Sequence, residues 1–493
     1  MLKVKRINKK FNPDYSRVII KPHIPHEKER IERIIMRVLG LAEEKVHEIL
    51  NRVCVNFSCR HKDVYKKLEK NYQKIKKFIP AGLEISEEKK KLLGAYFSCE
   101  YSIQAAAFFN PSIVLHPDQS GLEDGSIRFL LSFRSVGEGH ISSVEFRSGI
   151  LNKHLDFSFD EVSSYSEKAT LVNNSVYDKH LFFSKIPDIK ENEKEIYGQI
   201  FDLLPQEFCV SELNSVLSMI VPLEKSSILD KVTHLAECNY ELHFDSELDI
   251  SEKVIFPASK LDSNGIEDAR FVRFTEDDGS ITYYATYTAY DGHNISPQII
   301  ETKDFNTFKI ITLVGNFSKN KGMALFPRKI NGKYMMISRV DGESLYLMSS
   351  DNLHVWEKAE HLKAPENDWE FIQIGNCGSP IETEHGWILL THGVGPMREY
   401  SIGVILLDIE NPVKIIGNII EPLLTCNQEE RNGYVPNVVY SCGAILHKEN
   451  LIIPYAMSDT CSGIAMISLC ELLDNIHKQN GANIYVNCGE SQK

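Results

Sequence analysis

Several features that mark particular classes of protein are missing from this sequence. Its 11 cysteines are scattered without a C-x-x-C pair, so we predict neither a disulfide framework nor a zinc site. No stretch reaches the roughly 18 apolar residues that a membrane helix needs. The start, MLKVKRINKKFNP, has no apolar run followed by a small-residue cleavage site. These absences predict a soluble protein of a reducing, cytoplasmic compartment.

Positive charge is also scarce. The chain has 55 Lys and Arg against 68 Asp and Glu, a formal net charge of −13, whereas binding to a nucleic-acid backbone relies on clustered cations. The most basic stretch, residues 62–92, has acidic residues among its lysines and is interpreted as solvated helix faces. We therefore expect neither a nucleic-acid nor a membrane partner.

The residues that are present are sufficient for a large core. Hydrophobic residues make up 43% of the 493 positions, and the length is about three times that of a usual single domain. Four stretches have apolar residues at helical spacing, as Ile31, Ile35 and Val38 do in the first. These stretches are residues 27–50, 62–78, 87–109 and about 190–238.

The other stretches predict short strands, because they are rich in β-branched and aromatic residues and end at Gly, Asn, Asp or Pro. They are residues 126–136, 280–290, 332–340, 386–394, 400–408 and 451–457. TKDFNTFK (302–309) and SSDNLHVW (349–356) are weakly alike, and such recurrence favours the repeated blades of a β-propeller over a sandwich. The predicted class is mainly β, with N-terminal and inserted α-helical segments.

This pattern predicts five regions along the chain. They are an N-terminal segment with a helical region (1–107), a first blade region (108–160), a helical insertion (161–238), the remaining blades with the site (239–475), and a tail (476–493).

The stretch NGIEDARFVRF, residues 264–274, places Glu267 and Asp268 where a strand is about to begin. Successive side chains of an extended strand point to opposite faces, so the two acids are not expected to share one site. We interpret one of them as a proton donor that faces the centre of the fold. The other would face a neighbouring strand or an arginine.

Polar and cationic side chains recur in the stretches that follow. The candidates are Lys321, Arg328, Arg339, His392, Arg398, Tyr400 and Asp459. One acid, several cations and Trp387 as a face for a sugar ring would fit a pocket for a neutral polyol and an oxyanion. Arg398 is a candidate because it lies between His392 and Tyr400 in the sequence.

Five ordered motifs between about 264 and 470 carry a resemblance to a known family. They are GIEDARF, FPRKINGKY followed by SR, IGNCGSPIETEHGWILLTHGV, YSIGVILLDIENPVKIIG, and VPNVVYSCGA followed by PYAMSD. The chain resembles glycoside hydrolase family 130, the β-mannoside phosphorylases and their hydrolytic relatives. The resemblance implies a five-bladed β-propeller with the site on its axis, in a longer member that has extra helical segments.

The resemblance also implies a reaction, the inverting phosphorolysis of β-mannosides to α-mannose 1-phosphate and a shortened acceptor. Asp268 would be the general acid, acting through a hydroxyl of the mannosyl ring. An acid must be protonated when it acts, so a raised pKa is expected for Asp268. Nearby cations would oppose that shift unless bound phosphate neutralises them.

Residue roles follow from the same resemblance. Phosphate ligands would be Arg339, His392 and Tyr400, with Arg134, Arg147 and Arg398 as further candidates. Sugar ligands would be Asp459, Asn110 and Arg270. No metal or cofactor is expected, with inorganic phosphate as co-substrate, because the acids and His at the proposed site lack the spacing of metal ligands.

Departures from the family pattern leave alternatives open. Gln373 stands where many phosphorylases have Lys, and Ala269 replaces a usual Pro. We favour β-1,3- or β-1,2-linked mannosides as substrates. A β-mannoside hydrolase is an alternative, with a second carboxylate among Glu267, Glu382 and Glu384. A sugar-binding propeller without catalysis is another, and a homo-oligomer built on the helical segments is a hypothesis.

Overall fold

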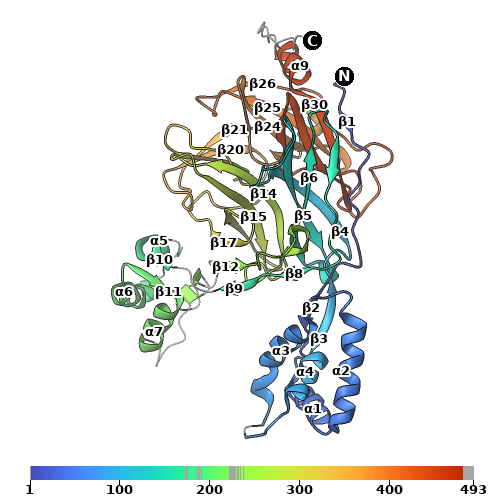
Figure 1. The fold of residues 1–493 in the computed structure, drawn as a ribbon. Coiled ribbons are helices and arrows are strands. Elements are labelled where there is room, and N and C mark those ends of the chain that lie inside the picture. The colour runs from blue at the N-terminus through green and yellow to red at the C-terminus, as the bar shows by residue number, and fades with distance from the viewer. Residues whose placement is uncertain are drawn as a thin grey trace.

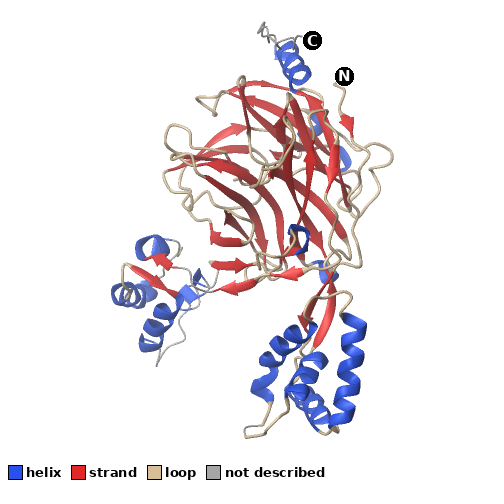
Figure 2. Ribbon diagram, in the orientation of Figure 1, coloured by secondary structure: helices blue, strands red, loops and turns tan. Residues whose placement is uncertain are grey.

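A computed structural model describes most of the chain. The described residues are 2–80, 82–172, 176–184, 186, 189, 191–220, 229, 232–233, 235–236 and 238–480. Figure 1 shows a large β-rich body, an arm of helices at the bottom that contains α1 to α4, and a small module at the side that contains α5 to α7. Figure 2 shows that strands, joined by loops, are the main regular structure of the body. The prediction of a mainly β protein is confirmed.

The strands of the body form five antiparallel sets along the chain, and the parallel pairing of Ser142 with Gly265 joins the first two sets in one twelve-stranded sheet. The first contains β4 (Ala107–Leu115), β5 (Ile127–Val136), β6 (Ser142–Leu151) and β7 (Phe157–Phe159). The second contains β14 (Gly265–Thr275), β15 (Ile281–Tyr290), β16 (Ile295–Thr302) and β17 (Thr307–Thr312), continued by β12 (Tyr240–His243) and β9 (Thr170–Val172). The third contains β18 (Ala324–Leu325), β19 (Tyr334–Ser338), β20 (Leu345–Ser350) and β21 (Ala359–Lys363).

The fourth and fifth sets complete the body. The fourth contains β22 (Gln373–Asn376), β23 (Ile381–Thr383), β24 (Gly386–Val394), β25 (Tyr400–Leu407) and β26 (Ile415–Asn418). The fifth contains β27 (Val439–Tyr440), β28 (Ile445–His447), β29 (Asn450–Met457) and β30 (Cys461–Ser468). Its edge is β1 (Lys5–Arg6), which pairs with β30 through Lys5 and Met466. The N-terminal segment therefore belongs to the last sheet, which the sequence did not reveal.

Each set shares a hydrophobic core with the next. Phe146 and Phe271 join the first set to the second, and other clusters join the second to the third, the third to the fourth and the fourth to the fifth. A further cluster packs Phe133 of the first set with Ile452 and Ile464 of the fifth. Because both faces of the sheets are covered, strands such as β24 are buried at every residue.

The arm is a helical unit on a two-stranded stalk. The stalk pairs β2 (Val18–Pro22) with β3 (Ser98–Ser102). The helical elements are α1 (Lys28–Leu39), α2 (Glu43–Phe57), α3 (Val64–Ile75), η1 (Lys76–Phe78) and α4 (Glu87–Tyr96). The helix expected over 87–109 is wrong beyond Tyr96, because residues 98–102 pair in the stalk and residues from 107 form the buried strand β4.

The predicted insertion is a small module flanked by strands of the body. Its elements are β10 (Val176–Asp178), α5 (Lys179–Ser184), η3 (Glu191–Glu193), α6 (Lys194–Leu203), β11 (Glu207–Cys209) and α7 (Val210–Ile220). Before it lie β8 (Glu167–Lys168) and β9, and after it come β12, η4 (Ile250–Glu252) and β13 (Lys253–Ile255). Most of the expected helical stretch 226–238 lies outside the described residues.

Short elements complete the description. They are η2 (Glu138–His140), η5 (Asp368–Glu370), η6 (Pro396–Arg398) and α9 (Leu469–Asn480). The predicted tail from 476 thus begins inside α9, and residues 481–493 lie outside the described part. Nine of the described cysteines are free thiols, whereas Cys470 is disulfide-bonded, which their scattered spacing did not predict. No helix in the described ranges is long and apolar enough to cross a membrane.

Candidate active site

A polar cavity of about 260 Å³ receives residues from all five strand sets. Its lining consists of Asn110, Arg134, Asp268, Lys321, Gly322, Arg339, Gln373, Gly375, His392, Arg398, Tyr400, Val435, Val438, Tyr440 and Asp459. Eight of the ten site residues predicted from the sequence are among them, and Arg147 and Arg270 are not. The cavity is therefore the candidate active site.

The Asp268 carboxylate enters the cavity from a bulge in β14. The pairing of β14 with β15 shifts register between Glu267 and Arg270, and Asp268 has a positive φ of 56°. Its Oδ1 accepts hydrogen bonds from Asn110 Nδ2 at 2.7 Å and from Arg134 Nη1 at 3.4 Å. The strict alternation expected for an extended strand is interrupted here, because a bulge adds a residue and re-aims its side chain.

Glu267 stands behind the cavity and not in its lining. Its carboxylate accepts from Arg134 Nη2 at 2.7 Å and from Lys321 Nζ at 2.6 Å. The expectation that one acid faces the centre and the other an arginine agrees with this arrangement, although Arg134 also contacts Asp268. Glu267 thus positions Arg134 and Lys321 at the edge of the cavity, and both of its carboxylate oxygens are used in these ion pairs.

The charge on Asp268 is stabilised in the protein without ligands. Burial alone would raise its pKa, but the positive charges of Arg134 and Arg270 and the hydrogen bond from Asn110 outweigh burial, so the pKa lies below its usual range. The raised pKa expected for a general acid is therefore wrong for this state. The physical reason is the one anticipated from the sequence, opposition by nearby cations.

Asp459 is the second carboxyl of the cavity and behaves in the opposite way. It lies in the turn between β29 and β30 with a φ of 50°. Burial and the negative charge of Asp268 raise its pKa to about 6, although Arg134 opposes the shift. Of the two carboxyl groups in the lining, Asp459 is thus the one that takes up a proton first as pH falls.

His392 and Arg339 form a second pair in the lining. His392 is in β24, and Arg339 directly follows β19. Burial, together with the charges of Arg339 and Arg270, holds the pKa of His392 well below its usual value, so the ring is neutral. Because Nδ1 lies 3.1 Å from the Asn376 carbonyl, we assign the proton to Nδ1. Nε2 then accepts from Arg339 Nη1 at 3.4 Å. His392 orients the guanidinium in this state.

Glycine is required beside this histidine. A Cβ on Gly375 would lie 2.4 Å from the His392 ring, and the two residues are cross-strand partners. The ring planes of His392 and Tyr400 are nearly parallel at 6.0 Å. Gly375 therefore lets the IGNCG motif pass close to the imidazole, and any side chain there would displace it.

Two predicted ligands lie outside the cavity. Arg270 is buried behind it, where Nη2 donates to Tyr440 Oη at 2.5 Å and Nη1 to the Asp268 carbonyl at 3.3 Å. It fixes the backbone of Asp268 and the Tyr440 hydroxyl from behind. Arg270 is not a partner of Glu267, whose described partners are Arg134 and Lys321.

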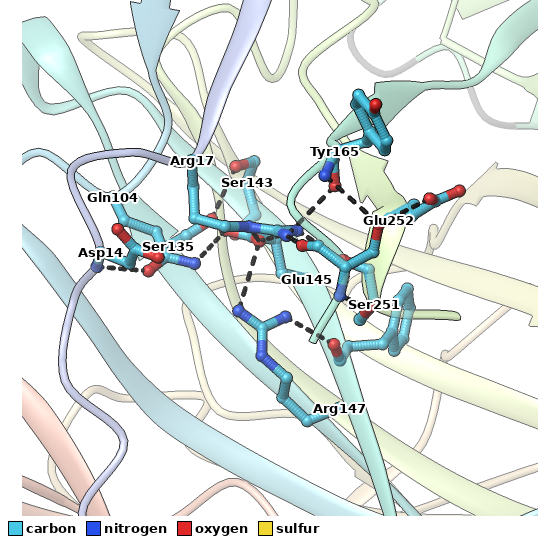
Figure 3. Close-up of polar contacts among 12 residues, drawn as sticks. Asp14, Arg17, Gln104, Ser135, Ser143, Glu145, Arg147, Tyr165, Ser251 and Glu252 are labelled. Atoms are coloured by element: carbon cyan, nitrogen blue, oxygen red, sulfur yellow. Dashed lines mark hydrogen bonds and ion pairs between the residues drawn. The ribbon is translucent and has the colours of Figure 1, made fainter. Parts of the chain in front are cut away.

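Arg147 points away from the cavity because β5 and β6 place it on the other sheet face. Arg134 pairs with Val144, whereas Arg147 pairs with Leu131, and residues separated by an odd number along a strand lie on opposite faces. Arg147 lies 3.7 Å from Glu145 and above the Phe108 ring. Figure 3 shows it in the buried network around Arg17 and Glu145.

The other site candidates from the sequence lie at the surface or in the hydrophobic core. Arg328 pairs with Glu382 at 2.6 Å at the surface, and Glu384 is exposed. Trp387, expected to face a sugar, is fully buried and donates to the Ile409 carbonyl at 3.0 Å. None of these residues is in the lining.

Sequence reasoning missed parts of the lining that depend on tertiary structure. Lys321 was noted as a cation and Tyr440 was not, yet both line the cavity. Gln373, which stands where many phosphorylases of the family have Lys, also lines the cavity. Lys321, with its ion pair to Glu267, supplies an ammonium group from another strand set. The NKG turn before β18 is the sequence signal that could have identified Lys321 as a site residue.

Unpaired polar atoms mark where a ligand would bind. Within the described residues, Asn110 Oδ1, Arg134 Nε and Arg339 Nε are buried without hydrogen-bond partners. Such groups are rare in folded proteins and are commonly satisfied by a ligand or ion. Asn110, Asp268, Arg398 and Asp459 also have positive φ, a strain that clusters at functional sites. In the described part of the chain, no group of His, Cys, Asp and Glu is arranged to hold a metal.

The fold and cavity define a mainly β protein in which two carboxyl groups and a cluster of cations share one pocket. A family model described as beta-1,4-mannooligosaccharide phosphorylase matches residues 219–478. The chain belongs to glycoside hydrolase family 130.

Curated relatives extend the match. A 1,2-beta-oligomannan phosphorylase of Thermoanaerobacter sp. (strain X514) is 32% identical over 230 residues, 45% of this chain and 75% of that protein. A beta-1,2-mannobiose phosphorylase of Listeria innocua is 26% identical over 299 residues, 59% of this chain and 81% of that protein. A solved structure of beta-1,2-mannobiose phosphorylase from Listeria innocua has 22% identity and a TM-score of 0.46, covering 76% of this chain and 92% of that one.

Proposed function

We propose that the protein is an inverting β-mannoside phosphorylase. The observation that carries the proposal is the charge of the cavity, where four cationic side chains surround Asp268 and Asp459. These cations are Arg134, Lys321, Arg339 and Arg398. Guanidinium groups match phosphate oxygens in pairs, so a cavity with this lining suits a phosphate dianion beside a sugar. Membership of the family supports the same activity.

The residues divide the chemistry between them. Phosphate held by Arg339, Arg398 and Tyr400 would attack the anomeric carbon, and the bond from that carbon to the leaving oxygen would break with inversion. Asp268 would supply the proton for the leaving oxygen through a hydroxyl of the mannosyl ring. The proton lost by phosphate would restore the carboxyl group. The products are α-mannose 1-phosphate and a shortened acceptor.

The cations also explain why phosphate must be present. In the protein without ligands, Arg134, Arg270 and Lys321 help to keep Asp268 ionised, and an ionised carboxylate cannot act as an acid. A bound dianion would oppose the charges of these cations and let the Asp268 pKa rise. Acid function would then depend on bound phosphate, and sugar would not be cleaved by water at the same rate.

The sugar would lie near Asp459 and Asn110. Asp459 is the other carboxyl of the cavity, and Asn110 has an unpaired side-chain oxygen that can accept from a sugar hydroxyl. We propose a β-1,2 or β-1,3 linkage in the substrate. Relatives named for β-1,2-linked mannosides support the first of these.

We infer that the five strand sets are the five blades of a β-propeller around this cavity. Shared hydrophobic cores between each consecutive pair, including the fifth with the first, support this arrangement. The pairing of β1 with β30 supports ring closure, since it joins the start of the chain to the last set. An experimental structure with five blades around Asp268 would test the inference.

A β-mannoside hydrolase is the second candidate, and Asp459 is the observation that favours it. An inverting hydrolase needs a second carboxylate as base for water, and Asp459 is present in the cavity. A pKa of about 6 leaves it a weak base near neutral pH. Glu267 and Glu382 are committed to ion pairs, so neither meets this need.

One assay separates these functions. The protein is incubated with β-1,2-, β-1,3- and β-1,4-linked manno-oligosaccharides, with and without inorganic phosphate. A phosphorylase forms mannose 1-phosphate only with phosphate, a hydrolase forms free mannose in both, and a binding protein forms neither. Equal product without phosphate would contradict the proposal.

We also propose that the arm takes part in a homo-oligomer. Met36 and Val55, on α1 and α2, are large apolar residues exposed to solvent, and exposed apolar groups on one unit are common at interfaces. Analytical ultracentrifugation tests this directly. A monomer at micromolar concentration would count against it.

A further inference from the structure

A second cavity, of about 360 Å³, lies between the arm and the body. Helix α3 and strand β2 of the arm form one side, and residues of β8, β9 and β12 form the other. Figure 1 shows the arm directly beneath β8 and β9. The arm, β8 and β9 lie outside residues 219–478, which the family model matches, whereas β12 lies inside them.

Lysines dominate the charged lining of this cavity. Six of them, against three carboxylates, gather in a chain whose formal net charge is −13. The lysines are Lys62, Lys66, Lys67, Lys70, Lys74 and Lys168, and the carboxylates are Asp63, Glu167 and Asp245. Residues 66, 70 and 74 are one helical turn apart on α3, so they lie on one face. The cavity therefore has a surplus of positive charge.

Only some of these lysines are neutralised. Lys62 pairs with Glu252 at 2.7 Å and Lys67 with Glu167 at 2.5 Å. Among the described residues, no carboxylate is paired with Lys66, Lys70, Lys74 or Lys168. Local desolvation, and after it the charges of Lys74, Lys70, Lys21 and Lys67, lower the pKa of Lys168 to about 8, although this residue is exposed overall. Lys66, Lys70 and Lys74 are exposed as well, so water screens part of the repulsion among these like charges, and a bound anion would reduce it further.

A buried hydroxyl in the same lining points to a ligand independently of charge. Ser166 is 1% exposed, and its Oγ has no hydrogen-bond partner among the described residues. It precedes β8, on the side of the cavity opposite α3. A buried polar group without a partner is destabilising, so an acceptor atom from a ligand would remove a penalty here.

The cavity also has an apolar part. Ile19, Ile20 and Pro22 of β2 line it, together with Phe244 and Leu248. A bare inorganic anion would leave these side chains uncovered. A molecule with a charged head and an uncharged body would cover both parts of the lining. The three carboxylates disfavour a long polyanionic strand.

We propose that this cavity binds a small organic molecule with a phosphoryl or diphosphoryl group, held by Lys70, Lys74 and Lys168 and by the Ser166 hydroxyl. The ligand bridges α3 of the arm to β8 of the body. The proposal does not depend on the activity proposed above, because no residue of this cavity lines the active site.

The test measures binding to the full chain by isothermal titration, with inorganic phosphate, inorganic pyrophosphate and mannose 1-phosphate as three separate probes. A single-stranded oligonucleotide is titrated as the competing candidate. The variants are Lys70→Gln with Lys74→Gln, and Ser166→Ala. The matched control is Lys76→Gln with Lys77→Gln, which removes the same charge from η1, the element directly after α3, and lies outside the cavity lining. Phosphorolysis is assayed in parallel on every variant.

We expect the wild type to bind an organic phosphate at a site that the double variant at 70 and 74 weakens at least tenfold and Ser166→Ala weakens several-fold. The control variant should bind as the wild type does, and all variants should keep their circular dichroism spectrum. Equal binding by all variants would overturn the proposal. So would binding of a single-stranded oligonucleotide, lost at 70 and 74, without binding of any of the three probes.

Discussion

Asn110 donates its side-chain amide to Asp268 over 2.7 Å, and each residue lies at a bulge where the backbone has a positive φ. The two bulges are in strands of different sets, β4 and β14. Without either bulge the alternation of side chains would turn the amide or the carboxylate to another face. The contact therefore depends on two local irregularities that must form together.

Replacement of Asp268 by asparagine should abolish turnover and spare the fold. Asn is isosteric with Asp and tolerates positive φ, so the bulge can keep its shape, while the proton donor is lost. General acid catalysis contributes about 10²–10⁴-fold, and a loss of that size is expected in kcat with a manno-oligosaccharide and phosphate. The control is Asp351→Asn, at an exposed turn. A variant that keeps a tenth of wild-type kcat would contradict the role of Asp268.

Asp459→Asn should stabilise the protein near neutral pH. The folded protein raises the Asp459 pKa from 3.8 to about 6, so between these values the folded state holds a proton that the unfolded state has released. Stability from this group therefore rises as pH falls from 6 to 4 and is lost above 6. At pH 7.5 the carboxylate costs at most about 3 kcal/mol, and Asn removes this cost.

Urea unfolding of the wild type and Asp459→Asn, repeated from pH 4 to pH 8, measures this effect. The gain in unfolding free energy should be largest above pH 7 and should vanish near pH 4. The control is Glu429→Gln, in an exposed loop away from the cavity lining. A gain that does not change with pH would mean that the carboxyl is not strained in the folded protein.

The sequence predicted the strands well because their signal is local. Runs such as 386–394 and 400–408 are apolar and end at turn residues, and both became strands within a residue of the expected bounds. The prediction that Trp387 faces a sugar was wrong, because an apolar stretch such as 386–394 is compatible with either a core or a cavity position for this side chain. Only the packing of Phe326 against its ring decides between them.

The composition of the site was predictable and its geometry was not. Asp268, Arg339 and His392 stand in motifs with fixed spacing, and the structure brings them into one cavity. The bulge at Asp268 arises from pairing with β15, and the hydrogen bond from Asn110 spans 158 residues. No pattern in a single segment contains such relations. Arg147 was wrongly included because motif position does not show which sheet face a side chain occupies.

Replacement of Arg339 by alanine should weaken the binding of phosphate and leave the reaction of the sugar otherwise unchanged. Hydrogen bonds to charged groups contribute about 1.5–3 kcal/mol, so KM for phosphate should rise about 10- to 100-fold. The matched control is Arg328→Ala, which removes a surface guanidinium paired with Glu382. Steady-state kinetics with phosphate varied at saturating sugar measure both. An unchanged KM for phosphate would place the anion elsewhere in the cavity.

We expect Arg17 and Arg147 to contribute to the stability of the folded protein and not to the binding of phosphate. Arg17 donates to Glu145 Oε2 at 3.0 Å and to the carbonyls of Ser163 and Tyr165, so it joins the N-terminal segment to the first set and to the strands before the insertion. Arg147 lies 3.7 Å from the same carboxylate. Breaking a buried pair costs about 3–5 kcal/mol, and Arg17→Met should approach this value.

Arg147→Met should cost less, about 1–2 kcal/mol, because Glu145 keeps Arg17 and a hydrogen bond from Gln104 at 2.8 Å. Urea unfolding ranks the two variants, and phosphate kinetics on the same preparations test the site. Both variants should have the wild-type KM for phosphate, since neither residue lines the cavity. If Arg147→Met raised that KM tenfold without loss of stability, the role inferred from its motif would be right and its place in the buried network secondary.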